Sequence, residues 1–78
     1  MRDESSCDIP FSYVRLFIQL EPLGWTFSAY DLKRHKWIVR GEPSLADNEK
    51  QAEDAAEAWA FGAGLLNANV TLHWKRKR

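Results

Sequence analysis

Residues 11 to 20 alternate between two kinds of side chain, which is the pattern of a β-strand. One parity is aliphatic and consists of Val14, Leu16, Ile18 and Leu20. The other parity is largely aromatic and polar and consists of Phe11, Tyr13, Arg15, Phe17 and Gln19. Because successive side chains of a strand point to opposite faces, one set can line a core while the other faces outward. A chain this short supplies about one covering layer, so we predict that the aromatic face is open to a partner.

Two more strands are predicted after this one. The sequence Glu21-Pro22-Leu23-Gly24 indicates a turn, since proline presets φ and glycine can adopt the left-handed region. A second strand is expected over residues 25–30, and a third over residues 37–40. Short connections favour an antiparallel meander. The core face of the third strand stays open, because Trp37 with Val39 and, alternatively, Ile38 are both reasonable core sets.

A helix is predicted next, with two candidate starts. Ser44 followed by Asp47 resembles a capping box, and Asn48 followed by Gln51 is the second candidate. Its apolar side, at spacings of three and four, consists of Leu45, Ala52, Ala55, Ala56, Trp59 and Ala63. Its solvent side is expected to carry Glu49, Glu53 and Glu57, and Gly62 and Gly64 are the expected stop signals.

A short last strand is predicted over residues 69–74, where Val70, Leu72 and Trp74 share one parity. The expected fold is therefore a two-layer α+β domain. It has an antiparallel sheet of three to four strands, in the order strand, strand, strand, helix, strand, with one helix on one face. The last strand could lie beside the first or the third. We expect residues 1–8 to be flexible, residues 9–74 to form the single domain and residues 75–78 to form a basic tail.

Composition narrows the classes of function. The chain has 78 residues, 45% of them hydrophobic, and no formal net charge, so there is no global attraction to nucleic acid or membranes. An acidic stretch, residues 41–57, lies between basic residues 31–40 and the basic tail. One cysteine and the lack of a signal-peptide or membrane-spanning pattern favour a cytoplasmic protein without disulfides.

The residue types that carry catalysis are sparse and scattered. His35 and His73 lack the spacing of a zinc site, and Cys7 has an acidic neighbour and no partner base in the sequence. No phosphate-binding, dinucleotide-binding or hydrolase motif is present. We therefore predict no enzyme, no catalytic residues, no metal, no cofactor and no small-molecule substrate.

Two surfaces are candidates for partner binding. The first is the aromatic sheet face, for which we predict the contact residues Tyr13, Arg15, Phe17, Tyr30 and Trp37. The alternative is a nucleic-acid surface, in which cations hold phosphates and aromatic rings stack on bases. Its predicted residues are Lys33, Arg34, Lys36, Arg40, Lys75, Arg76, Lys77 and Arg78.

Residues 13 to 59 resemble the partial double-stranded-RNA-binding-like fold of HicB-type antitoxins, three strands followed by a helix. The resemblance rests on the strand 14–20, the turn leading into Trp25-Thr26-Phe27-Ser28, the segment Tyr30-Asp31-Leu32, Gly41 and the Ala-rich helix 52–59. The double-glycine turn and the DNA-binding module of that family are absent. In size and layout the chain is also similar to small proteins of phages and mobile elements, including anti-CRISPR inhibitors. Both resemblances imply a protein that blocks a partner.

The sequence thus predicts a small non-catalytic protein that acts through protein–protein interaction, either by self-association as a homodimer or by inhibiting a larger complex. Nucleic-acid binding is the alternative function, and membrane binding is not expected.

Overall fold

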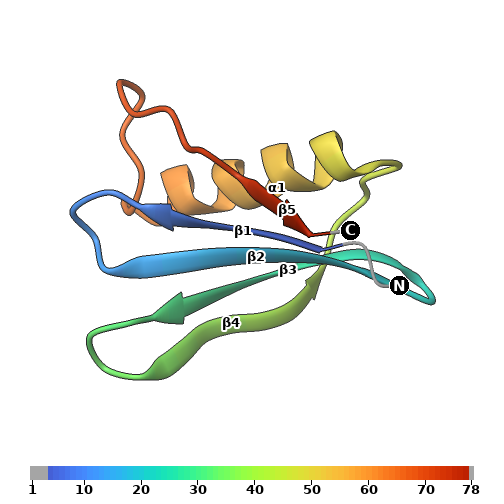
Figure 1. The fold of residues 1–78 in the computed structure, drawn as a ribbon, viewed down its shortest axis with the longest axis horizontal. Helices are drawn as coiled ribbons and strands as arrows, with labels where there is room; N and C mark the ends of the chain where they lie inside the picture. Colours follow the sequence, from blue (N-terminus) through green and yellow to red (C-terminus); the bar gives the residue numbers. More distant parts are fainter. Residues whose placement is uncertain (1–3, 78) are drawn as a thin grey trace.

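In the computed structural model, which describes residues 4–77, a single helix packs on one face of a five-stranded antiparallel sheet (Figure 1). The elements, in chain order, are β1 (Glu4–Ile9), β2 (Val14–Glu21), β3 (Gly24–Asp31), β4 (Lys36–Pro43), α1 (Glu49–Gly62) and β5 (Lys75–Lys77). The predicted α+β class is confirmed, but the sheet has five strands where three to four were expected.

The strands lie in the order β4-β3-β2-β1-β5, so the first and last strands of the described chain are neighbours. Glu4 is paired with Lys77, and the register then runs through Ser6 and Lys75. The position of the last strand, which the sequence left open, is therefore beside the N-terminal strand, and both described ends lie at the same end of the sheet (Figure 1).

The face of the sheet under α1, which we call the inner face, is aliphatic because of strict alternation along β2 and β3. Leu16, Ile18 and Ala29 are at most 1% exposed. From the helix side Ala52, Ala56 and Ala60 are equally buried, so small side chains let α1 approach closely. Trp59 is the large side chain of this interface, and its ring lies 6.0 Å from that of Phe27. The predicted apolar side is therefore confirmed for Ala52, Ala56 and Trp59, but it was wrong for Leu45, which precedes α1, and for Ala63, since both are exposed.

Helix α1 begins at the second candidate start. Asn48 is the N-cap, and its side-chain oxygen accepts a hydrogen bond from the backbone N–H of Gln51 at 2.9 Å. The Gln51 side chain accepts in turn from the N–H of Asp47 at 2.8 Å. At the other end Gly64 has φ +77, the left-handed conformation that glycine allows.

The N-terminal prediction was wrong for the described residues 4–8. Instead of a flexible segment, they form most of β1, in which Ser5, Cys7 and Ile9 are buried on the inner face. The isolated segment looks polar, but its alternating small and apolar residues fit between β2 and β5. Residues 1–3 lie outside the described residues.

The first predicted strand begins later than expected. Phe11 and Tyr13 have φ +66 and +58, so the chain turns here instead of extending, and β2 starts at Val14. The two aromatic side chains consequently lie in the β1–β2 turn, with 99% and 64% of their surface exposed.

The last strand was also misplaced. Residues 69–74 form no strand, and β5 consists of residues that were assigned to a basic tail. The predicted alternation still governs burial, since Leu72 is buried and Val70 and Trp74 are half-buried. The indole N–H of Trp74 donates to Glu57 at 2.8 Å, so this segment leans towards α1 and separates from β1.

Strand β4 resolves the open question about the third predicted strand through two register irregularities. Trp37 is paired with Tyr30, and Val39 is paired with Ala29, so one extra residue, Ile38, stands between two consecutive partners. Trp37 therefore lies on the face away from α1, while Val39 packs against the core. The first predicted core set is half right, because Val39 packs against the core and Trp37 does not. The alternative, Ile38, was wrong, since it is 43% exposed.

Candidate functional site

The sheet face opposite α1, which we call the outer face, is not covered by any helix or strand of residues 4–77 (Figure 1). Alternation along β2 and β3 gives it Arg15, Phe17 and Gln19 from one strand and Thr26, Ser28 and Tyr30 from the next. These side chains are half-buried by their neighbours, so the face is ordered and still accessible.

Three rings form an aromatic cluster on the outer face, made of Phe17, Tyr30 and Trp37. The Trp37 ring centre lies 5.6 Å from that of Phe17 and 4.9 Å from that of Tyr30, with interplanar angles of 56° and 77°. Such tilted and edge-to-face pairs are the favoured arrangements of aromatic rings. The guanidinium of Arg40 lies 5.2 Å from the Trp37 ring centre, which adds a cation–π contact.

Trp37 reaches this cluster because of the irregularity at Ile38, which turns it to the outer face. It remains 42% exposed, so the cluster is accessible from solvent and from the free edge of the sheet. A hollow of about 410 Å³ lies beside it on the outer face. The residues that line this hollow include Glu4, Phe17, Gln19, Thr26, Ser28, Trp37 and Arg40.

Charged side chains frame the aromatic cluster. Arg15 Nε donates to Asp8 Oδ1 at 2.6 Å, and this hydrogen bond lowers the pKa of the Asp8 carboxyl below its usual value. At the β5 side, Lys77 Nζ lies 3.8 Å from a carboxylate oxygen of Glu4. These exposed pairs contribute little to stability, but they order the polar border of the outer face.

The structure brings most of the predicted partner-binding residues together. Arg15, Phe17, Tyr30 and Trp37 lie on the outer face, on three neighbouring strands. Tyr13 lies apart from them in the β1–β2 turn, where the ammonium of Lys33 is 5.9 Å from its ring centre.

The predicted nucleic-acid residues lie in separate places. Lys33 and Arg34 belong to the β3–β4 loop, and Lys36 begins β4 at the same end of the sheet. Lys75 and Lys77 lie on β5 at the opposite edge. Through β1, Lys77 is in register with Gln19 at the other end of β2 and Lys75 with Phe17 near its middle. The two basic groups are thus at diagonal corners. Arg40 lies in the aromatic cluster, and Arg78 is outside the described residues.

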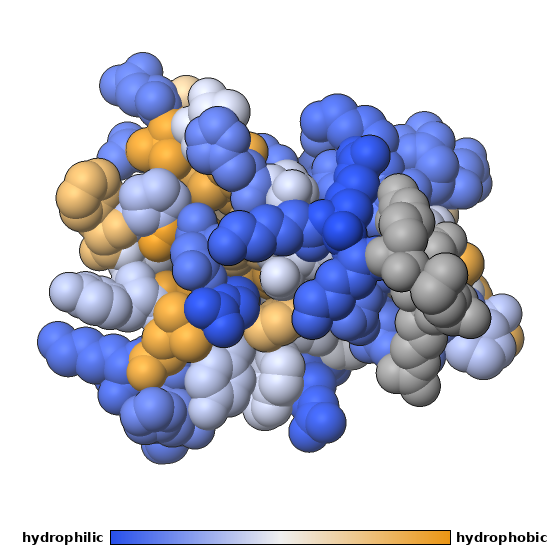
Figure 2. Space-filling view, viewed as in Figure 1, coloured by the Kyte–Doolittle hydropathy of each residue, from blue (hydrophilic) through white to orange (hydrophobic). Residues whose placement is uncertain are grey.

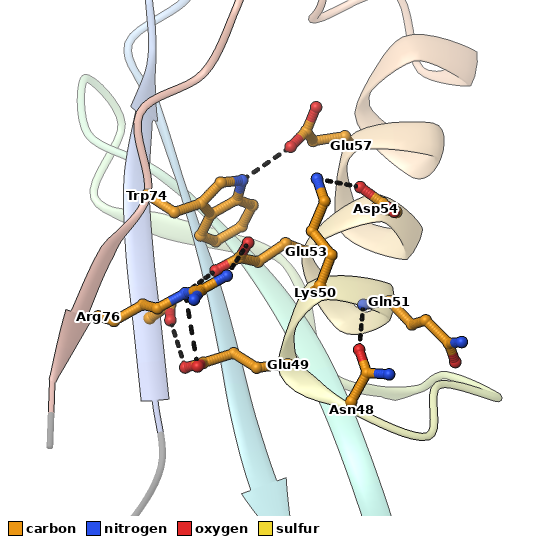
Figure 3. A network of polar contacts seen from close by, with 10 residues as sticks. Asn48, Glu49, Lys50, Gln51, Glu53, Asp54, Glu57, Trp74 and Arg76 are labelled. Carbon is orange, nitrogen blue, oxygen red and sulfur yellow. Dashed lines mark hydrogen bonds and ion pairs between the residues drawn. The ribbon is translucent and has the colours of Figure 1, made fainter.

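Arg76 has a different role from its neighbours on β5. Its guanidinium donates to both carboxylate oxygens of Glu53, at 3.0 and 3.1 Å, and lies 3.4 Å from Glu49 (Figure 3). Ser5 Oγ also donates to Glu49, at 2.8 Å. This network joins β1, β5 and α1 on the inner side of the sheet.

The expectation that Glu53 lies on a solvated helix side was wrong, since it is 3% exposed. Sequence reasoning missed this network because the helical wheel assigns acidic residues to solvent by default. One feature of the sequence could have indicated the network. Glu49, Glu53 and Glu57 form an acidic row at four-residue spacing, and the basic residues 75–78 can pair with such a row across the fold.

The described residues 4–77 include one cysteine, Cys7, and two histidines, His35 and His73. No group of three or more His, Cys, Asp or Glu side chains there could hold a metal ion. Cys7 lines a hollow of about 420 Å³ with Asp8, Thr71 and His73, between β1 and the segment that leads to β5. Burial, together with the nearby carboxylates, raises the pKa of the Cys7 thiol to about 12, so it is a poor nucleophile at neutral pH.

Hydrophobic side chains also gather at the end of the molecule where β1 turns into β2, while hydrophilic ones cover the region of β5 (Figure 2). The residues of that end include Ile9, Pro10, Phe11, Leu65, Leu66 and Val70.

Across residues 4–77, α1 is too short and too polar to cross a membrane.

No protein-family model, curated protein or solved structure gives a significant match to this chain. The resemblance to HicB-type antitoxins and to small phage-borne inhibitors accordingly stays a sequence-based expectation.

Proposed function

We propose that this chain is a non-catalytic binding protein that recognises a partner protein with its outer face. The observation that carries the proposal is the aromatic cluster of Phe17, Tyr30 and Trp37, capped by Arg40, on a sheet face that α1 leaves uncovered. Trp, Tyr and Arg are the residue types that most often dominate protein interfaces. Binding through this face would occlude the surface of the partner, as expected of an inhibitor of a larger complex.

The geometry of the rings favours a protein over a nucleic acid. Base stacking requires open ring faces, but Arg40 already lies over Trp37, and the rings pack on one another at steep angles. The two basic groups lie at diagonal corners of the sheet, so they do not border one continuous track for a phosphate backbone. A nucleic acid is therefore the second candidate.

Site-specific photo-crosslinking in cells that naturally express the chain tests the proposal. A photoreactive residue in place of Gln19, on the outer face, should crosslink to a distinct protein. The same residue in place of Ala58, on the exposed side of α1, is the matched control. The Gln19 crosslink should be lost in a Phe17→Ala, Trp37→Ala variant that keeps its circular dichroism spectrum.

Three outcomes would contradict the proposal. They are equal crosslinking from both positions, a Gln19 crosslink that survives loss of the aromatic cluster, and adducts that contain nucleic acid instead of protein. In the last case, binding to single-stranded oligonucleotides should fall steeply with salt and should weaken on charge reversal of Lys33, Arg34 and Lys36.

A further inference from the structure

Strand β4 is a free edge of the sheet. It is the last strand in the sheet order, and within residues 4–77 no other strand pairs with the edge of β4 that points away from β3. The other edge strand, β5, is much shorter and is held to α1 through Arg76. An unpaired strand edge presents backbone donors and acceptors to any second strand that fits it.

The irregularities of β4 give this edge a symmetric pattern. Asp31, Ala29 and Phe27, which are two residues apart on β3, are paired with Lys36, Val39 and Glu42, which are three residues apart on β4. Those three β4 residues therefore share the inner face, although a regular strand would not place them together. The cation Lys36 and the anion Glu42 therefore lie at equal distances in sequence before and after Val39.

We propose that β4 pairs antiparallel with β4 of a second copy of this chain, around a two-fold axis at Val39. In this register Lys36 of each copy lies opposite Glu42 of the other, so the interface contains two equivalent charge pairs. Neither side chain has an ion-pair partner within the described part of its own chain. Opposite charges directly across an antiparallel pair are stabilising, and like charges are destabilising.

The pattern of faces and charges along β4 also disfavours the neighbouring registers. A shift by two residues in one direction places Val39, on the inner face, opposite Trp37 of the second copy, which lies on the outer face. A shift by two residues in the other direction places Arg40 opposite itself. The first shift mismatches the faces of the two strands and the second opposes like charges, so the register centred on Val39 is the one that β4 fits.

Apolar surface supports the same arrangement. Trp37 and Ile38 are 42% and 43% exposed at the free edge. In the proposed register Trp37 lies opposite Gly41 of the second copy, and an aromatic ring across from an edge glycine covers the backbone that glycine leaves bare. The irregularity at Ile38 lies opposite the second irregularity of the other copy, which falls at Arg40 and Gly41.

This dimer goes beyond the proposed function and does not depend on it. It extends the sheet across two copies and leaves both outer faces open, so each aromatic cluster remains available to a partner. A monomer would refute the dimer but leave the outer-face proposal intact, and a Gln19 crosslink that survives loss of the aromatic cluster would refute the outer-face proposal but leave the dimer intact.

Sedimentation velocity from low micromolar to near-millimolar concentration tests the pairing, since interfaces below about 1,200 Å² are commonly weak. The wild-type chain should shift from monomer to dimer. Glu42→Lys and Lys36→Glu should each weaken the dimer about tenfold or more, because each opposes like charges twice. The control Glu21→Lys makes the same charge change on β2, two strands from the edge, and should have no effect.

A mixture of the two single variants gives the sharpest result. The Glu42→Lys chain carries two cations at these positions and the Lys36→Glu chain two anions, so the mixture should form a heterodimer although each chain alone repels itself. Circular dichroism should show that all variants stay folded. A wild-type monomer at every concentration, a dimer indifferent to Glu42→Lys, or a mixture that stays monomeric would each overturn the proposal.

Discussion

The backbone conformation at single residues determines which side chains of this protein are exposed. One extra residue, Ile38, sends Trp37 to the outer face while Val39 stays in the core, and the aromatic cluster exists because of that step. Likewise, left-handed backbone at Phe11 and Tyr13 ends the strand pattern and moves two exposed rings to the β1–β2 turn.

Cys7 allows a prediction at the same scale. Its thiol stays neutral in the folded chain up to pH of about 12, whereas in the unfolded chain it ionises near 9. Between these values the unfolded state binds fewer protons, so the free energy of unfolding falls as pH rises, by up to about 1.4 kcal/mol per pH unit. Below pH 9 this contribution is fully present.

Urea titrations at several pH values from neutral to strongly alkaline check the Cys7 prediction. The comparison is with Cys7→Ala, because lysine and tyrosine titrations are common to both chains and cancel in the difference. The stability of the wild type should decline more steeply above pH 9 than that of the variant. Parallel declines would contradict the assigned cause.

At the scale of elements, α1 lies close to the sheet because its contact side is made of alanines. Ala56 is 0% exposed between α1 and the strands, whereas Ala58 on the same helix is exposed. Trp59 fills the remaining space against Phe27. The helix is therefore positioned by small side chains, and its distance from the sheet depends on their size.

Enlarging this contact should destabilise the protein. Ala56→Leu forces extra methylene groups into a filled interface and should lower the free energy of unfolding by about 1–3 kcal/mol. Ala58→Leu adds the same volume on the solvent side and should change it by less than about 0.5 kcal/mol. Equal effects in thermal or urea unfolding would show that α1 does not pack as described.

The ion pair between Arg76 and Glu53 should stabilise the contact between β5 and α1. Arg76→Ala leaves Glu53, whose side chain is 4% exposed, without its cation. Loss of one partner of a buried ion pair lowers the free energy of unfolding strongly. Because the Arg76 side chain is 44% exposed, we expect a smaller decrease here, of about 1–3 kcal/mol. Lys77→Ala, at an exposed pair on the same strand, should cost under about 0.5 kcal/mol.

A double variant separates pairing from simple loss of side chains. Adding Glu53→Gln to Arg76→Ala removes the unpaired charge, so the two changes together should cost less than the sum of the single costs. Urea midpoints of the four chains measure this difference. Strict additivity would mean that the two side chains do not interact in solution.

At the scale of the whole molecule, the chain closes on itself because its first and last described strands pair. β1 lies between β2 and β5, so residues near the N-terminus belong to the interior of the sheet. The inner face is covered by α1 and by the segment that carries Leu72, and the outer face is not. The side chains of the inner face are therefore buried and stabilise the fold, whereas those of the outer face stay accessible to solvent.

Hydrogen exchange should reflect this arrangement. Backbone amides of β2 and β3, which are paired on both sides, should exchange most slowly, while those of residues 63–74 should exchange fastest. In dilute protein β4 should be intermediate, and its protection should rise with concentration if the edge pairs with a second copy. Protection of residues 63–74 equal to that of β2 would contradict the described fold.

The sequence by itself determined the elements whose pattern is local. Alternation from Val14 to Leu20, the cap at Asn48 with Gln51 and the alanine stripe each depend on near neighbours, so the α+β class, the capped helix and the parity of β2 followed from them. Most of the predicted outer-face residues, Arg15 and Phe17 among them, followed from that parity.

Only the tertiary structure decided what depends on partners distant in the chain. The polar segment from Glu4 became a strand because β2 and β5 pair with it, and Glu53 became buried because Arg76 arrives from the far end of the sequence. The bulges of β4 arise from its register with β3, which no local pattern encodes. Long-range pairing is stabilising only after the chain has closed, so a reading of near neighbours cannot supply it.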